Sequence, residues 1–353
     1  MGDTSILAPS VQELAEQGIT KVPEQYLQPN QDSILVSNTT SSPQLPIIDF
    51  DKLLCEDGIE LEKLDNACKE WGFFQLINHG VNPSLVESVK IGVQQFFHLP
   101  MEEKKKFWQT EEELQGSGQV YVALEEQKLR WGDMFYVKTF PLHIRLPHLI
   151  PCMPQPFRDD FENYSLELKK LCFKIIERMT KALKIQQPNE LLDFFEEGDQ
   201  SIRMNYYPPC PQPDQVIGLN PHSDASALTI LLQVNEMQGL QIKKDGMWVP
   251  INPLPNAFVV NIGDLLEIMT NGIYRSIEHR ATANSEKERI SVAGFHNIQM
   301  GRDLGPAPSL VTPETPAMFK AITLEEYVNG YLASKIKGKS YLDVVRIKND
   351  IHA

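Results

Sequence analysis

Short β-like runs that recur between residues 202 and 296 restrict the possible folds of this chain more than any other feature. Most of the runs are apolar, and turn signals such as Asp245-Gly246 separate them. Several short strands with this spacing are typical of a β-sandwich or a jelly roll, in which two sheets face each other. The runs expected to form strands are residues 202–207, 228–234, 240–243, 258–262, 276–279 and 289–295.

Helix-like apolar spacing flanks this series of strands on both sides. Residues 61–71, 83–97 and 157–183 have it before the strands, and residues 323–334 have it after them. Another strand is expected over residues 72–77. The predicted fold class is therefore mainly β with flanking helices (α+β). It has an N-terminal α/β region and a C-terminal helix placed to cover the mouth of the β core.

Three candidate metal ligands lie within the β-rich part of the chain. His222 and Asp224 precede one apolar run, and His279 follows in the next part of the sequence. Two imidazoles and one carboxylate can hold a divalent metal on one face and leave the opposite face open, which is the ligand set of non-haem iron oxygenases. The open positions can accept a bidentate 2-oxo acid and dioxygen. The sequence therefore predicts a metal enzyme.

Arg289 and Ser291 follow the last candidate ligand. They lie on the same side of a predicted strand, because alternate side chains of a strand point to the same face. The planar guanidinium matches the far carboxylate of a five-carbon 2-oxo diacid, and the hydroxyl can donate a further hydrogen bond. Arg289 could instead form a surface ion pair within the charged stretch 286–289. Its position after the candidate ligands favours the first interpretation, a clamp for the 2-oxo acid.

Composition and charge exclude several classes of partner. The chain has 33 basic and 47 acidic residues, and its net charge of −14 opposes binding to nucleic acid or to anionic membranes. The five cysteines form no C-x-x-C pair and favour a reducing compartment. We expect no secretory signal, because the N-terminal residues show no charged stretch followed by an apolar run. We expect a cytoplasmic protein that acts on a small molecule as a monomer.

The order of motifs resembles a known family. Residues 203–211 read R-M-N-Y-Y-P-P-C-P, and the H-x-D, the distal histidine and the R-x-S element follow them. This order is similar to that of the plant Fe(II)- and 2-oxoglutarate-dependent dioxygenases. The resemblance is densest with the senescence-related and thebaine and codeine O-demethylase branch. Further matching segments are residues 46–50, 71–81, 96–100 and 338–343.

The resemblance implies a double-stranded β-helix core and a set of site residues. It makes His222, Asp224 and His279 the catalytic iron ligands. The residues that it places around 2-oxoglutarate are Asn205, Tyr207, Arg289 and Ser291. It also implies Fe(II) as the cofactor, 2-oxoglutarate and O2 as co-substrates, and ascorbate as a support for turnover. The expected regions are an N-terminal arm (1–44), an N-terminal dioxygenase region (45–195), the jelly-roll core (196–305) and a C-terminal helical segment (306–353).

The branch implies oxidation of a largely hydrophobic plant specialised metabolite, with O-demethylation of an alkaloid favoured. Hydroxylation, desaturation or ring closure of a flavonoid, coumarin, other phenolic or hormone is the alternative. One departure is Arg130, since the branch usually carries an acidic residue there. If this segment approaches the mouth of the pocket, its positive charge weighs against carrying over the alkaloid preference. The apolar candidates for the substrate wall are Val120, Phe135, Met204, Phe295 and Phe319.

Two other classes of protein can use part of this pattern. A zinc hydrolase can be built on two histidines and a carboxylate, but the sequence shows no general-base carboxylate near the motif, and a hydrolase does not need the clamp. A noncatalytic jelly-roll binding protein would need neither three ligands nor the clamp. Metal analysis distinguishes a zinc hydrolase from an iron oxygenase, and succinate release distinguishes an oxygenase from a binding protein.

Overall fold

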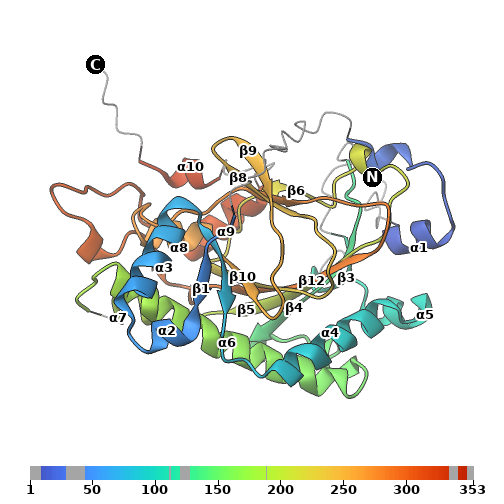
Figure 1. Cartoon of the computed structure of the whole chain (residues 1–353), viewed down its shortest axis with the longest axis horizontal. Helices are drawn as coiled ribbons and strands as arrows, with labels where there is room; N and C mark the ends of the chain where they lie inside the picture. The colour runs from blue at the N-terminus through green and yellow to red at the C-terminus, as the bar shows by residue number, and fades with distance from the viewer. Residues whose placement is uncertain are drawn as a thin grey trace.

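Two β-sheets face each other in this protein, and helices cover the outer face of the larger sheet (Figure 1). The computed structural model describes residues 9–28, 44–110, 113–119, 128–187, 189–333 and 341–347. Within these residues, the expected mainly β fold with flanking helices is confirmed.

The two sheets differ in size and in the regions of the chain that they combine. Strand β1 is parallel to β2, and the other strand pairs are antiparallel. In the described part of the chain the larger sheet has eight strands, in the spatial order β1 (Ile47–Asp49), β2 (Phe73–Ile77), β10 (Phe258–Ile262), β7 (Leu228–Gln233), β12 (Arg289–His296), β5 (Gln200–Tyr207), β4 (Asp133–Phe140) and β3 (Gly116–Gly118). The smaller sheet has the order β6 (Leu219–His222), β11 (His279–Ala281), β8 (Leu240–Lys244) and β9 (Met247–Pro250). A separate pair is formed by β13 (Asp303–Leu304) and β14 (Ile322–Thr323).

Most helices lie between strands of the facing sheets in the sequence, whereas α1 precedes the sheets and α9 and α10 follow them. The long helices α4 and α6 run beside the larger sheet on its outer side (Figure 1). The α-helices among the described residues are α1 (Val11–Glu16), α2 (Phe50–Leu54), α3 (Gly58–Glu70), α4 (Pro83–Phe97), α5 (Met101–Lys104), α6 (Phe157–Ala182), α7 (Asn189–Leu192), α8 (Asp264–Met269), α9 (Leu324–Ala333) and α10 (Leu342–Val345).

Local sequence signals explain where the two long helices begin and how they pack. The side chain of Asn82 accepts a hydrogen bond from the backbone N–H of Ser84 at 2.9 Å, and Pro83 occupies the first turn of α4. Helix α6 buries one apolar face along its length, and α4 packs against it. Gly92 lies at this contact, where the ring of Phe157 fills the space beside it. The helices predicted over residues 83–97 and 157–183 are confirmed.

Alternation along the strands decides which side chains enter the space between the sheets. On β5, Ile202 and Met204 are fully buried in the core that the helices cover, whereas Arg203 lines the cavity between the sheets. On β12, Ile290 belongs to the same core and Arg289 lines the cavity. The outer core therefore stabilises the sheet, and the polar residues of the same strands line its inner face.

One strand differs from its predicted range. The sequence predicts a strand over residues 276–279, but β11 is His279–Ala281. The backbone N–H of Ser276 donates to Glu267 Oε2 at 2.6 Å and is therefore not available to a neighbouring strand. The predicted ranges also omit β1, β3, β4, β6, β9, β13 and β14. Strand β6 carries no apolar run, whereas β4 contains the apolar residues 134–137.

The C-terminal helix is confirmed as α9, while Ser334, the last residue of its predicted range, lies outside the described residues. None of the helices in the described part of the chain combines the length and the apolar character that a membrane-spanning segment needs.

We expect Gly92→Ala to destabilise the fold although alanine is the better helix former. A Cβ at residue 92 would lie 2.1 Å from the Phe157 ring, and the neighbouring rings of Phe96 and Phe161 restrict the movement of that ring. Overpacking of this kind costs about 1–3 kcal/mol. Urea unfolding measures the loss. Gly58→Ala, at the start of α3 with nothing within 4 Å of the new Cβ, is the matched control and should be neutral or slightly stabilising; equal stability of the two variants would contradict the packing argument.

Candidate metal centre and co-substrate site

The three predicted metal ligands converge at one end of the space between the sheets. His222 ends β6 and His279 begins β11, and the two residues are direct partners across this antiparallel pair. Asp224 follows in the turn after β6, and its Oδ1 lies 3.5 Å from His222 Nε2 and 3.6 Å from His279 Nε2. One ligand atom from each residue lies within 4.8 Å of the others.

Backbone carbonyls orient both imidazoles. The Nδ1 of His222 lies 2.8 Å from the carbonyl oxygen of Asn220, and the Nδ1 of His279 lies 3.1 Å from that of Ile277. A carbonyl can only accept, so Nδ1 carries the proton in each ring and donates it. Each Nε2 therefore presents its lone pair toward Asp224, as a metal-binding imidazole requires.

The carboxylate of Asp224 is oriented in the same way. Its Oδ2 accepts hydrogen bonds from Thr229 Oγ1 at 2.7 Å and from Asn261 Nδ2 at 2.8 Å. Oδ1 then faces the two histidine rings. Thr229 and Asn261 thus occupy one carboxylate oxygen, and the other is directed at the place where a metal would bind.

The charge states of these groups suit a metal. Burial alone raises the pKa of Asp224, but the adjacent imidazoles of His279 and His222 outweigh burial and hold the pKa below its usual range. Burial, and after it the neighbouring His222, lowers the pKa of His279 to about 4. At neutral pH the aspartate is ionised and His279 is neutral, which are the forms that bind a metal. Two imidazole nitrogens and one carboxylate oxygen on one face fit ferrous iron with open positions toward the cavity.

The predicted clamp lines the same cavity as the ligands, which holds about 530 Å³ of space including its open mouth. In the ladder between β5 and β12, Ser291 is opposite Asn205 and Arg289 is opposite Tyr207. All four side chains line the cavity because they occupy alternate positions of the two strands. The structure therefore places the four residues expected around 2-oxoglutarate beside the three candidate ligands.

Arg289 is a buried cation whose hydrogen bonds are incomplete. It is 2% exposed, and its Nη2 donates to Gln233 Oε1 at 2.9 Å. Its guanidinium carbon lies 5.3 Å from the centre of the Tyr207 ring. Its Nε has no hydrogen-bond partner, and neither has Oδ1 of Asn205. Buried polar groups without a partner are rare and costly, so a charged donor in a cavity wall fits an anionic ligand.

The five residues predicted to line the substrate pocket lie in different places. Phe295 lines the cavity, and Val120 lies outside the described residues. The expectation needs correction for Phe135, Met204 and Phe319, which are buried in the core instead. Met204 points away from the cavity because its neighbours on β5 point into it, and Phe135 is its partner on β4. Phe319 packs beneath the guanidinium of Arg346, 4.6 Å from its ring centre.

Several residues that build the site were not predicted from the sequence. Thr229 and Asn261 hold Asp224, and Arg203 lines the cavity. Each is a polar residue at an inward position of a strand. Thr229 and Asn261 lie inside runs that otherwise read as apolar core. A polar residue at an alternate position of an apolar strand is the sequence signal that could have identified these two.

The geometry defines the class of site found in non-haem iron oxygenases, and comparisons with known proteins agree with it. Residues 198–298 match the 2OG-Fe(II) oxygenase superfamily, and residues 45–152 match the N-terminal region of non-haem dioxygenases in morphine synthesis. Protein SRG1 of Arabidopsis thaliana is 54% identical over 98% of this chain and 98% of its own length. Oxoglutarate-dependent flavonoid 7-O-demethylase 1 of Ocimum basilicum is 52% identical over 98% of this chain and 92% of its own. Codeine O-demethylase of Papaver somniferum is 48% identical over 96% of both chains.

A solved structure shows the same architecture. The crystal structure of JOX2 in complex with 2OG, Fe and JA superposes with a TM-score of 0.87 at 32% sequence identity, over 97% of this chain and 98% of the other. The chain therefore belongs to the plant 2-oxoglutarate- and Fe(II)-dependent dioxygenases, and the predicted jelly-roll core is confirmed. It is an oxidoreductase that uses Fe(II) and 2-oxoglutarate and acts on a small molecule.

We expect Thr229→Val to weaken metal binding, because it removes one of the two hydrogen bonds that orient Asp224 while keeping the shape of the side chain. Loss of a partner of this kind typically lowers metal affinity about 10-fold or more. Anaerobic Fe(II) titration of the apoprotein measures the change. Thr180→Val removes a similarly buried hydroxyl, which donates to Ile176 within α6, and serves as the control. Unchanged affinity in the Thr229 variant would refute the orienting role.

Proposed function

We propose that His222, Asp224 and His279 hold the iron of this oxygenase, and that Arg289 and Ser291 bind the far carboxylate of 2-oxoglutarate. The observation that carries the proposal is one cavity in which three clustered ligand atoms lie beside a buried arginine with an unpaired donor. When bound, the metal supplies the oxidation, in which O2 and 2-oxoglutarate become succinate, CO2 and one oxygen atom for the substrate.

The protein's own side chains bind, orient and exclude water. The carbonyls of Asn220 and Ile277 hold the imidazoles in the required tautomer before any metal arrives. The fixed charge of Arg289 sets the direction of the co-substrate, since its planar fork matches a carboxylate. Leu231 and Phe295 line the same cavity and reduce the access of water to the reacting groups.

We propose O-demethylation of a methoxylated aromatic metabolite as the reaction, with an alkaloid as the first candidate. Oxidation of an O-methyl carbon gives a hemiacetal, which releases formaldehyde and leaves a hydroxyl group on the substrate. Relatives named as demethylases of codeine and of a flavonoid support this choice. Hydroxylation, desaturation or ring closure would use the same site and stays the alternative.

Two arginines near the cavity favour a second candidate, a flavonoid or another phenolic that is neutral or acidic. Arg203 lines the cavity wall, and its Nε is shielded from solvent without a hydrogen-bond partner. Arg130 lies close enough that Arg203, after burial, helps to lower its pKa to about 10. The segment passes against Tyr207, since a Cβ at Gly132 would lie 2.7 Å from that ring. Two adjacent positive charges, one of them in the cavity wall, oppose a cationic alkaloid.

The remaining expectations also stay proposals. We propose that the protein acts as a cytoplasmic monomer and binds neither nucleic acid nor membranes. The net charge of −14 supports the second part.

Asp224→Ala should abolish turnover and iron retention, because it removes the anionic ligand between the two histidines. Arg289→Ala should keep the iron and raise the 2-oxoglutarate concentration needed for half-maximal rate by roughly 30-fold or more, the factor that about 2 kcal/mol represents. Succinate formation and bound iron are measured together. Arg158→Ala, at an exposed pair with Asp159, is the control. Full activity of the Asp224 variant would contradict the ligand assignment, and tightly bound zinc in place of iron in the anaerobically purified protein would favour a hydrolase.

Arg130→Asp should shift substrate preference toward cations. With two methoxylated aromatic probes that differ in one group, an amine or a carboxylate, the ratio of kcat/KM for the cation to that for the anion should rise at least about 10-fold, which is about 1.4 kcal/mol. Mass spectrometry of the two products measures the ratio. Arg158→Asp makes the same change in net charge on the exposed surface and should leave the ratio unchanged. An equal ratio in both variants would exclude Arg130 as a determinant of substrate charge.

A further inference from the structure

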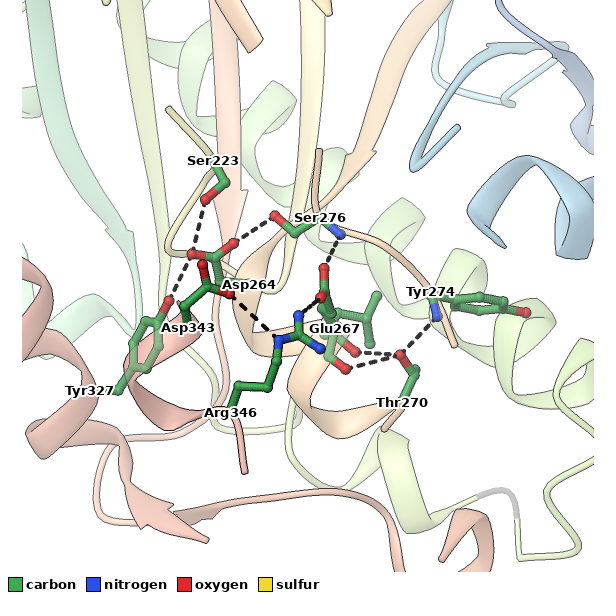
Figure 2. Close-up of polar contacts among 10 residues, drawn as sticks. Ser223, Asp264, Glu267, Thr270, Tyr274, Ser276, Tyr327, Asp343 and Arg346 are labelled. Carbon is green, nitrogen blue, oxygen red and sulfur yellow. Dashed lines mark hydrogen bonds and ion pairs between the residues drawn. The ribbon is translucent and has the colours of Figure 1, made fainter. Parts of the chain in front are cut away.

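A buried polar network with Asp264 at its centre joins Ser223 and Ser276, which belong to the segments that carry the candidate metal ligands (Figure 2). Asp264 begins α8 and is 1% exposed. Hydroxyl groups from at least three of the described residues donate to its carboxylate. Ser223 Oγ donates to Oδ2 at 3.1 Å, Tyr327 OH donates to Oδ2 at 2.8 Å, and Ser276 Oγ donates to Oδ1 at 2.6 Å.

Two of these donors belong to the segments that carry the metal ligands. Ser223 stands between His222 and Asp224, and Ser276 precedes His279 in the segment that leads into β11. The backbone N–H of Asp264 also donates to the carbonyl oxygen of Asp224 at 2.8 Å. One side chain therefore ties together two parts of the chain that are distant in sequence and that must stay at a fixed spacing for three ligands to meet.

The third donor brings in the C-terminal part of the chain. Tyr327 lies on α9 and is fully buried. A second contact runs in parallel, because Glu267 on α8 accepts from the backbone N–H of Ser276 at 2.6 Å and from Arg346 Nη2 at 2.8 Å. Figure 2 shows the two contacts with α8 that come from the C-terminal part of the chain, Tyr327 with Asp264 and Arg346 with Glu267.

The network has the character of a positioning device. A buried carboxylate costs free energy unless several donors satisfy it, and a satisfied network fixes one arrangement of its members. Here the members are the turn that carries His222 and Asp224, the segment that leads to His279, and α9. Loss of one donor would make the spacing between the two segments that carry the candidate ligands less fixed. The metal would then have to bind a less preorganised site.

We propose that Asp264 is a positioning residue for the metal centre, and that Tyr327 couples helix α9 to the affinity of that centre. The inference rests on the proposed ligand set and adds to it a group that contacts neither the metal nor the substrate. It predicts that removing a hydroxyl from α9 weakens metal binding although α9 contributes no ligand.

The chain offers a matched control for a purely structural role. Tyr274 is also fully buried, and its hydroxyl also donates to a carboxylate, Asp65 Oδ1 on α3, at 3.0 Å. In Figure 2 its ring extends away from the Asp264 network. Tyr327→Phe and Tyr274→Phe therefore remove the same kind of hydrogen bond, one inside the network and one outside it.

The experiment measures Fe(II) affinity of the full-length apoprotein under anaerobic conditions with 2-oxoglutarate present, together with thermal unfolding. We expect both phenylalanine variants to lose similar stability. Tyr327→Phe should raise the dissociation constant for Fe(II) at least about 10-fold, whereas Tyr274→Phe should stay within about twofold of the wild type. Equal constants for the two variants would overturn the positioning role.

A second pair of variants serves if Tyr327→Phe does not fold. Ser276→Ala removes another donor to Asp264, and Ser165→Ala removes a buried hydroxyl that donates to Gln200 Oε1 at 2.6 Å, outside the network. The same difference in Fe(II) affinity is expected, and its absence overturns the inference. His222→Ala separates this outcome from failure of the site itself. If the wild type and His222→Ala bind Fe(II) equally, the proposed ligand set is wrong; if only His222→Ala loses Fe(II) and the paired variants agree, the positioning role alone is wrong.

Discussion

The pairing of β6 with β11 is the constraint on which the site depends. It places His222 directly opposite His279, so that two imidazoles from distant parts of the chain lie with ring centres 4.3 Å apart. The third candidate ligand, Asp224, follows in the turn after β6, with its Oδ1 beside both rings. Backbone carbonyls and the side chains of Thr229 and Asn261 then fix the direction of each donor atom. The centre is preorganised by hydrogen bonds that do not need the metal.

The larger sheet serves two purposes because its faces differ. One face is apolar and packs beneath α4 and α6, while the other lines the cavity with polar and charged groups. The apolar face supplies hydrophobic burial, which is the main stabilising contribution in a fold of this kind. This stabilisation offsets the free-energy cost of burying an arginine with an unpaired donor on the inner face. The binding group and the packing residues alternate along the same strands, β5 and β12.

Charge is distributed unevenly around the cavity. The protein as a whole carries a net charge of −14, but Arg203, Arg130 and Arg289 gather near the cavity. Arg289 and Arg203 line the cavity, and Arg130 lies close to Arg203. The position of α9 adds a link between the C-terminal part of the chain and the ligand segments through Asp264. The proposed determinants of substrate choice and of metal affinity thus include residues that the ligand motif itself does not contain.

The sequence by itself predicted the candidate ligand triad, the candidate clamp and about half of the strands among the described residues. Residue chemistry and the period of two along a strand are local properties that can be read without coordinates. The tertiary structure alone decided which residues meet across sheets. It placed Met204 in the core and its neighbour Arg203 in the cavity wall, with Arg130 near Arg203. It also placed Asp264 in contact with both segments that carry candidate ligands. It also began β11 at His279, because Glu267 occupies the backbone N–H of Ser276. These outcomes depend on the register between distant segments, which no local pattern records.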